Sequence, residues 1–135
     1  MKVAVIGDIH GTTKFLECYK NIQETDSDVE KIIVLGDWFD PYVDIDFDTM
    51  IERYNEFVKI WKSDDRIISI LGNHDLAGYI ISNDSTNRTL RFGKMRKQLR
   101  EVIEPNLPES YLTYKIGDYM FSHAGVSQEW LNDIN

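Results

Sequence analysis

Five side chains of the types that bind divalent metal ions follow short apolar runs in this sequence. Asp8 and His10 follow one run, Asp37 a second, Asn73 a third and His123 a late one. Carboxylate, amide and imidazole donors without sulfur suit manganese, iron, zinc, nickel or cobalt better than calcium or magnesium. Each residue alone has an ordinary explanation as a cap, a turn residue or a hydrogen-bonded histidine. Because they occur together, and all three histidines of the chain lie in or directly beside this set, we interpret them as a metal site.

Three apolar strands are predicted to position these donors, at residues 2–6, 31–35 and 66–71. A glycine directly follows each strand and is expected to let the backbone turn sharply and approach a ligand. An extended backbone at Asp8 and His10 would point both side chains the same way. The carboxyl ends of parallel strands form the edge at which open α/β sheets bind ligands.

Two helical patterns separate the three strands. One covers about 12–22, and the other runs to about residue 62 from a cap at Asp48 or Thr49. Strands that alternate with helical crossovers predict an α/β fold with a mostly parallel sheet flanked by helices.

The second half of the chain is predicted to be less regular. After Asp75 the pattern loosens into a polar loop at 82–87. A basic helical segment follows to about Ile103, where Pro105 and Pro108 end it. Segments 111–115 and 119–122 flank a turn signal and predict an antiparallel hairpin, whose second arm runs into the last histidine.

Composition restricts the class of protein. The chain has 135 residues, of which 42% are hydrophobic and 28% charged, as expected for a single globular domain over residues 1–135. Its formal net charge of −8 argues against a nucleic-acid partner. The first apolar run breaks at Gly7, too early for a signal peptide or a membrane span, so we expect a cytoplasmic protein without membrane attachment. Cys18 is the only cysteine, which excludes an internal disulfide and a thiolate metal cage.

Four sequence blocks, GDIHG, GDWFD, GNHD and SHAGV, resemble the signature blocks of the calcineurin-like metallophosphoesterase superfamily. They run in the same order from residue 7 to residue 126. The last block resembles the branch that contains phosphoprotein phosphatases and diadenosine-tetraphosphate hydrolases. The resemblance implies the sandwich fold of that superfamily, with the late hairpin as part of its second half.

The resemblance also implies a dinuclear metal centre. Asp37 would be shared between the two ions, one of which would also bind Asp8 and His10, and the other Asn73 and His123. His74 would be the general acid, oriented by the Asp40 carboxylate. Two cations can bind phosphate oxygens and lower the pKa of a water so that a metal-bound hydroxide is available near neutral pH.

Two departures from the family pattern affect these expectations. Phosphoprotein phosphatases carry an arginine after the second aspartate of the GDxxD block, where this chain has Pro41 and Tyr42. Arg88 and Arg91 are our candidates to bind substrate instead, although the basic run to which they belong also fits a solvated helix face. No histidine follows His123, so the late Gly-His block of the superfamily is missing. We expect a truncated version of the fold, the N-terminal portion of a longer domain; completion by water or a second subunit, or a degenerate protein without catalysis, are the alternatives.

The predicted function is metal-dependent hydrolysis of a phosphorylated small molecule, a nucleotide or dinucleotide polyphosphate, or a phosphoprotein. A nuclease or cyclic-nucleotide phosphodiesterase, and a catalytically incomplete metal-binding interaction module, remain as alternatives. An incomplete sheet would expose apolar surface, which favours a homo-oligomer.

Overall fold

The structure is a computed structural model that describes residues 1–80, 95–125, 127, 129 and 132. Its strands are β1 (Val3–Ile6), β2 (Lys31–Val34), β3 (Ile67–Ser69), β4 (Thr113–Ile116) and β5 (Tyr119–Ser122). Its helices are α1 (Lys14–Thr25), α2 (Phe47–Ser63), α3 (Asn73–Ile80), α4 (Arg96–Ile103) and the 3-10 helix η2 (Glu104–Glu109). Together they form the α/β architecture with a late hairpin that the sequence predicts.

Strands β1, β2 and β3 form a parallel sheet in that order, with β2 in the middle. Ile32 and Ile33 of β2 are fully buried on opposite faces, as expected for a central strand covered on both sides. The third strand is shorter than predicted. After Ser69 the chain instead forms a parallel bridge between Ile70 and Tyr111, which joins the sheet to the segment leading into the hairpin.

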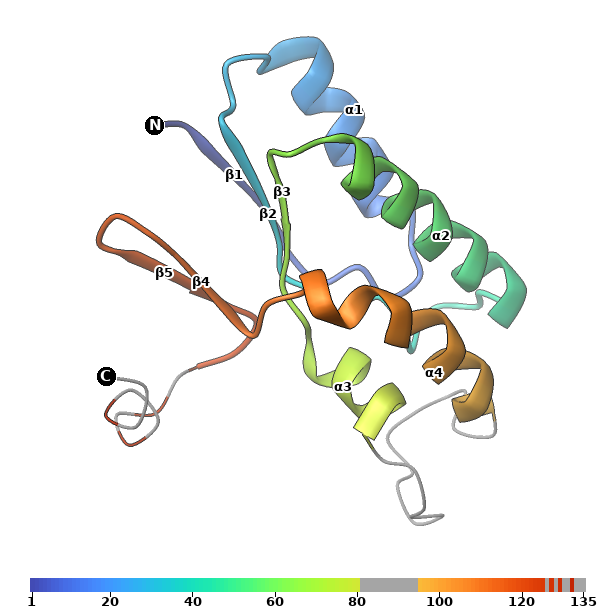
Figure 1. The fold of residues 1–135 in the computed structure, drawn as a ribbon. Helices are drawn as coiled ribbons and strands as arrows, with labels where there is room; N and C mark the ends of the chain where they lie inside the picture. Colours follow the sequence, from blue (N-terminus) through green and yellow to red (C-terminus); the bar gives the residue numbers. More distant parts are fainter. Residues whose placement is uncertain (81–94, 126, 128, 130–131, 133–135) are drawn as a thin grey trace.

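Helices α1 and α2 lie on one side of this sheet and the β4–β5 hairpin lies on the other (Figure 1). The helical side holds the main core, in which Phe57 of α2 stacks on Trp38 with ring centroids 4.2 Å apart. The predicted cap of α2 is wrong. Asp46 is the N-cap, and its carboxylate accepts the Thr49 backbone N–H at 2.8 Å.

The hairpin covers a smaller core of Ile33, Ile68 and Ile70 on the opposite face. Strands β4 and β5 pair antiparallel, which confirms the predicted hairpin. Because β5 runs toward the carboxyl ends of the parallel strands, it brings His123 to the edge where the other candidate ligands lie (Figure 1).

The segment after β3 differs from the prediction. GNHD begins a helix, α3, at Asn73 that the sequence did not predict, and the predicted polar loop at 82–87 lies outside the described residues. The basic segment is helical in α4, as expected, with Leu99 and Ile103 buried against the main core. Helix α4 ends at Ile103, as predicted. The chain continues as the 3-10 helix η2, with Pro105 in its first turn, where proline is compatible with a helix, and Pro108 further along.

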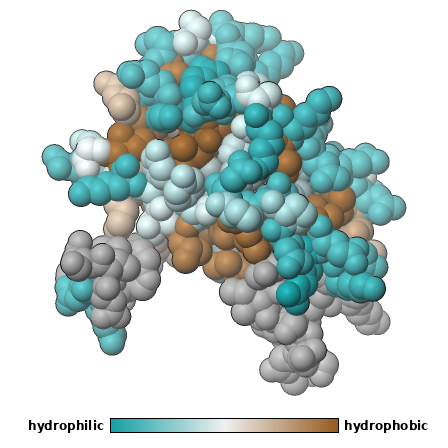
Figure 2. Space-filling view, in the orientation of Figure 1, coloured by the Kyte–Doolittle hydropathy of each residue, from teal (hydrophilic) through white to brown (hydrophobic). Residues whose placement is uncertain are grey.

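The visible surface over the helices is mostly hydrophilic, and apolar side chains show between them (Figure 2). Within the described part of the chain, no helix combines the length and apolar character that a membrane span requires. Exposed apolar side chains do occur at Met1, Val5 and Tyr119, around a cavity of about 700 Å³ between β1 and the hairpin. The predicted self-association through such surface stays a prediction.

Candidate metal centre

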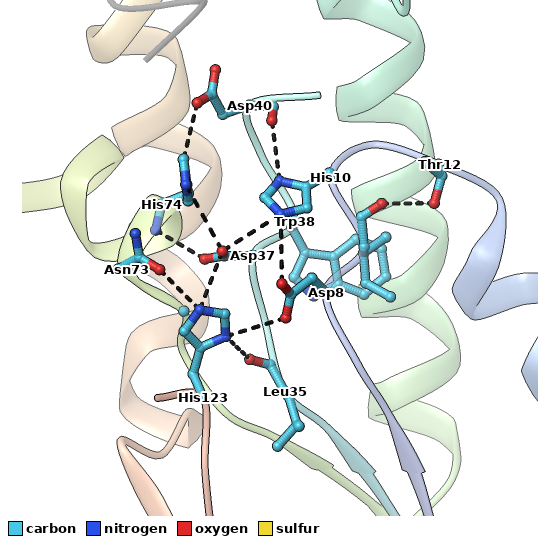
Figure 3. Close-up of polar contacts among 12 residues, drawn as sticks. Asp8, His10, Thr12, Leu35, Asp37, Trp38, Asp40, Asn73, His74 and His123 are labelled. Carbon is cyan, nitrogen blue, oxygen red and sulfur yellow. Dashed lines mark hydrogen bonds and ion pairs between the residues drawn. The ribbon is translucent and has the colours of Figure 1, made fainter. Parts of the chain in front are cut away.

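The site lies at the carboxyl edge of the parallel sheet, where four segments converge (Figure 3). The β1–α1 connection, the segment after β2, the start of α3 and the end of β5 each contribute to it. The side chains brought together are those of Asp8, His10, Asp37, Asp40, Asn73, His74 and His123. Arg88 and Arg91, the predicted substrate ligands, lie outside the described residues.

Asp8, His10 and Asp37 form the first group of metal-type donors. One atom from each lies within 4.8 Å of the others, and His10 Nε2 is 3.8 Å from Asp8 Oδ2 and 3.6 Å from Asp37 Oδ2. The sequence predicts an extended backbone from Asp8 to His10, and this is wrong, because His10 has a φ of 49°. The His10 amide instead donates to the Asp37 carbonyl at 2.6 Å, so the segment after β2 holds this turn in place.

Two histidines are held so that Nε2 faces the centre. His10 Nδ1 lies 3.2 and 3.1 Å from the carbonyls of Phe39 and Asp40, and His123 Nδ1 lies 2.7 Å from the carbonyl of Leu35. A carbonyl can only accept, so Nδ1 carries the proton in both rings. In the neutral rings this leaves the Nε2 lone pairs to bind a cation, an arrangement typical of metal-bound histidines.

Asp37, Asn73 and His123 form a second group. His123 Nε2 is 3.2 Å from Asp37 Oδ2 and 2.9 Å from Asn73 Oδ1. With Nδ1 already protonated, all three facing atoms are electron-pair donors, and such atoms repel unless a proton or a cation lies between them. The donor set therefore fits a divalent cation of the kind that binds mixed nitrogen and oxygen ligands.

His74 occupies a different position from these ligands. Its Nδ1 lies 2.9 Å from Asp40 Oδ2, without hydrogen-bond alignment, and protonation of the ring would make this contact an ion pair. Its Nε2 points toward the centre but lies 4.0 Å from Asp37 Oδ2, and its backbone N–H donates to Asp37 Oδ1 at 2.9 Å. The His74 ring thus lies beside the candidate metal ligands, and its Nε2 is directed toward the centre that they surround.

The backbone at the site is strained. His10, Asp37 and Asp40 have φ values of 49°, 53° and 66°, a region that residues other than glycine rarely adopt. Asp40 also precedes Pro41, which normally keeps its neighbour extended. Each such residue costs about 1–3 kcal/mol, and strain of this kind concentrates at functional sites.

Asp75 supports the site, a role that the sequence did not reveal. It is 2% exposed, and its carboxylate accepts the backbone N–H groups of Asp37, Trp38 and Gly72 at 2.8, 2.8 and 2.9 Å. Burial raises the pKa of Asp75 to about 6, although these hydrogen bonds oppose the rise. Its position in GNHD was visible, but no local pattern shows which amides a buried carboxylate will reach. Asp75 fixes the strand end that presents Asp37.

Gly36 and Gly72 allow two strand ends to approach closely. Of the three glycines predicted at the strand ends, Gly36 has the positive φ, 84°, that favours glycine. A Cβ at Gly72 would lie 2.0 Å from Asp37 Oδ1 and 2.5 Å from Asp37 N. Gly72 is required because the central ligand occupies the space of its missing side chain.

Gly72→Ala should therefore displace the Asp37 carboxylate. We expect a loss of about 1–3 kcal/mol in unfolding free energy from overpacking, together with weaker Mn²⁺ binding, measured by urea unfolding and calorimetry. Gly7→Ala is the matched control, since Gly7 also precedes a ligand but a Cβ there meets nothing nearer than Lys14 Nζ at 4.0 Å. Equal Mn²⁺ affinity in the two variants would contradict this role of Gly72.

Comparison with known proteins agrees with this geometry. The family model for calcineurin-like phosphoesterases matches residues 1–135, so the chain belongs to that family. This confirms the predicted superfamily and makes metal-dependent phosphoester hydrolysis the general class of chemistry, with Asp8, His10 and Asp37 as a candidate metal site. No curated protein and no solved structure matches the chain. The predicted branch within the superfamily stays a prediction.

Proposed function

We propose that the protein hydrolyses phosphate esters at a dinuclear metal centre that shares the Asp37 carboxylate. One observation supports this most strongly. Asp37 Oδ2 faces the Nε2 atoms of His10, His74 and His123 at 3.6, 4.0 and 3.2 Å, and the Asp37 side chain is only 4% exposed. A buried carboxylate without a counter-charge costs free energy, because it has lost its hydration. Cations bound between this carboxylate and the imidazole nitrogens would supply that counter-charge.

The ligands divide between two ions as follows. One ion would bind Asp8, His10 and Asp37, and the second would bind Asp37, Asn73 and His123. Bound divalent ions supply positive charge that holds the phosphate oxygens and lowers the pKa of water. The identity of the ions, among manganese, iron, zinc, nickel and cobalt, remains part of the proposal.

His74 and Asp40 handle the proton on the leaving side. A water attacks phosphorus and gives one proton to solvent as the bond from phosphorus to the ester oxygen breaks. That oxygen takes a proton from His74 Nε2, and solvent then returns a proton to the ring. Asp40, 2.9 Å from His74 Nδ1, stabilises the imidazolium from which the proton comes. His74 lies close enough to the ligands to act and is not needed as one.

The proposed substrates are a phosphorylated small molecule, a nucleotide or dinucleotide polyphosphate, or a phosphoprotein. The net charge of −8 disfavours a long polyanion. A pocket of about 420 Å³ opens beside Asn73 and His123 and offers room for part of such a substrate.

The direct test is phosphate release from p-nitrophenyl phosphate as Mn²⁺ is titrated into metal-free protein. We expect activity that rises with Mn²⁺ and is abolished by EDTA. Activity on bis(p-nitrophenyl) phosphate alone would favour the nuclease or phosphodiesterase alternative. Metal binding without turnover of either compound would favour the interaction module, and an absence of both would contradict the proposal.

A further inference from the structure

Tyr42 stands at the rim of the candidate metal centre and has no part in the roles assigned above. Its ring centroid lies 4.3 Å from that of His10, with the planes at 47°. It also faces the His74 ring edge-on, at 6.3 Å and 85°. Tyr42 is thus the aromatic residue beside both the metal-ligand side and the proton-donor side of the site.

The backbone holds Tyr42 in this place. Asp40 has a left-handed conformation, and Pro41 after it is buried, with its Cβ 3.6 Å from where a Cβ of Gly11 would lie. The Gly11 carbonyl in turn accepts Arg53 Nη1 of α2 at 2.7 Å. Packed neighbours therefore hold the backbone from which Tyr42 projects, and its ring rests against His10. A held aromatic ring loses less entropy when a ligand binds to it.

Most of the Tyr42 side chain is nevertheless left uncovered. The residue is 76% exposed although it touches His10, which is only 7% exposed. A tyrosine that served only to shield His10 would bury one face of its ring and would not need to be presented so openly. An exposed, positioned aromatic surface beside a reactive centre is suited to stacking against another flat ring.

We propose that Tyr42 determines specificity by stacking on an aromatic ring of the leaving group. This inference rests on the proposed function, because it uses the position of His74: Tyr42 faces that ring with centroids 6.3 Å apart, so an ester oxygen that takes the His74 proton lies near Tyr42 as well. The group attached to that oxygen then extends over Tyr42. The substrate is accordingly a phosphate ester whose leaving group carries a flat ring, either a nucleobase or an aryl group.

The test compares substrates that differ in the ring. AMP is paired with ribose 5-phosphate, and phenyl phosphate with ethyl phosphate, all with saturating Mn²⁺. Tyr42→Ala should raise KM about 5- to 20-fold for an aromatic member while its aliphatic partner changes less than about twofold and kcat is retained. Tyr42→Phe should restore the wild-type KM. Tyr119→Ala is the matched control, because Tyr119 is also 76% exposed but lies at the start of β5, away from the site.

Each outcome decides the proposal. An effect confined to AMP assigns a nucleobase, and one confined to phenyl phosphate assigns an aryl group. Equal changes within both pairs, or no change, overturn the role of Tyr42.

If the wild type hydrolyses none of the four compounds, the proposed function fails, and calorimetric dissociation constants for the same pairs still test Tyr42. Ring-dependent binding that Tyr42→Ala abolishes would then support it, and its absence would overturn it.

Discussion

Asp37→Asn protein should bind Mn²⁺ more than about 100-fold more weakly than the wild type. Loss of a residue that only supports a metal ligand lowers metal affinity about 10- to 100-fold, and loss of a ligand itself should lower it further. The substitution preserves the shape and can keep Oδ1 as acceptor for the His74 N–H, 2.9 Å away. It removes the negative charge and the Oδ2 atom that faces three imidazole rings. The affinities for both proposed ions should fall together, as measured by calorimetry and by metal content after dialysis.

The control for this experiment removes the same charge elsewhere. Asp118 lies in the exposed hairpin turn, so the Asp118→Asn variant should bind Mn²⁺ like the wild type. Retention of two ions with unchanged affinity by Asp37→Asn would show that this carboxylate is not shared. Loss of one ion alone would restrict Asp37 to a single ion.

The second large effect is expected for His74→Asn, which should lower kcat about 10²- to 10⁴-fold, the usual contribution of general acid catalysis. Metal content should not change, because His74 Nε2 is 4.0 Å from Asp37 Oδ2 while Nδ1 is held by Asp40. Steady-state kinetics and metal analysis on the same sample measure both quantities.

The leaving group provides a control within the His74 experiment. A phenolate such as p-nitrophenolate needs less help from a proton donor than an alkoxide does. The loss in kcat should therefore be smaller for p-nitrophenyl phosphate than for ethyl phosphate. If His74→Asn instead releases metal, His74 is a ligand and its assignment as the acid is wrong.

The convergence of the candidate site could be predicted because its cause is topological. Strands that alternate with helices become parallel, and parallel strands deliver their ends to one edge. This places Asp8, Asp37 and Asn73 together from their sequence positions alone, and the hairpin signal adds His123. The apolar pattern of β2 likewise indicates a strand buried on both faces.

Features that depend on contacts distant in sequence could not be predicted. The left-handed backbones of His10 and Asp37 are held by hydrogen bonds between the two loops. Aspartate and histidine adopt this region more often than most residues, but the sequence does not show at which positions they do so. Helix α3, which begins at Asn73, was not predicted, because GNHD is too short to show a helical pattern of its own. The helix begins where Asp75 can reach three amides of two strand ends.

The cap of α2 shows a smaller error of the same kind. Three residues near its start, Asp46, Asp48 and Thr49, are all good capping residues, and sequence alone does not rank them. The structure selects Asp46 because its side chain accepts from the Thr49 amide. Arg88 and Arg91 lie outside the described residues, so their substrate-binding role stays a prediction.

The most direct measurement is anomalous diffraction at the manganese edge from crystals grown with saturating Mn²⁺. Two anomalous peaks should appear, both within coordination distance of an Asp37 carboxylate oxygen, one beside Asp8 and His10 and the other beside Asn73 and His123. A map without a peak at Asp37, in crystals whose protein is otherwise folded as described, would contradict the proposed metal centre and the hydrolytic function with it.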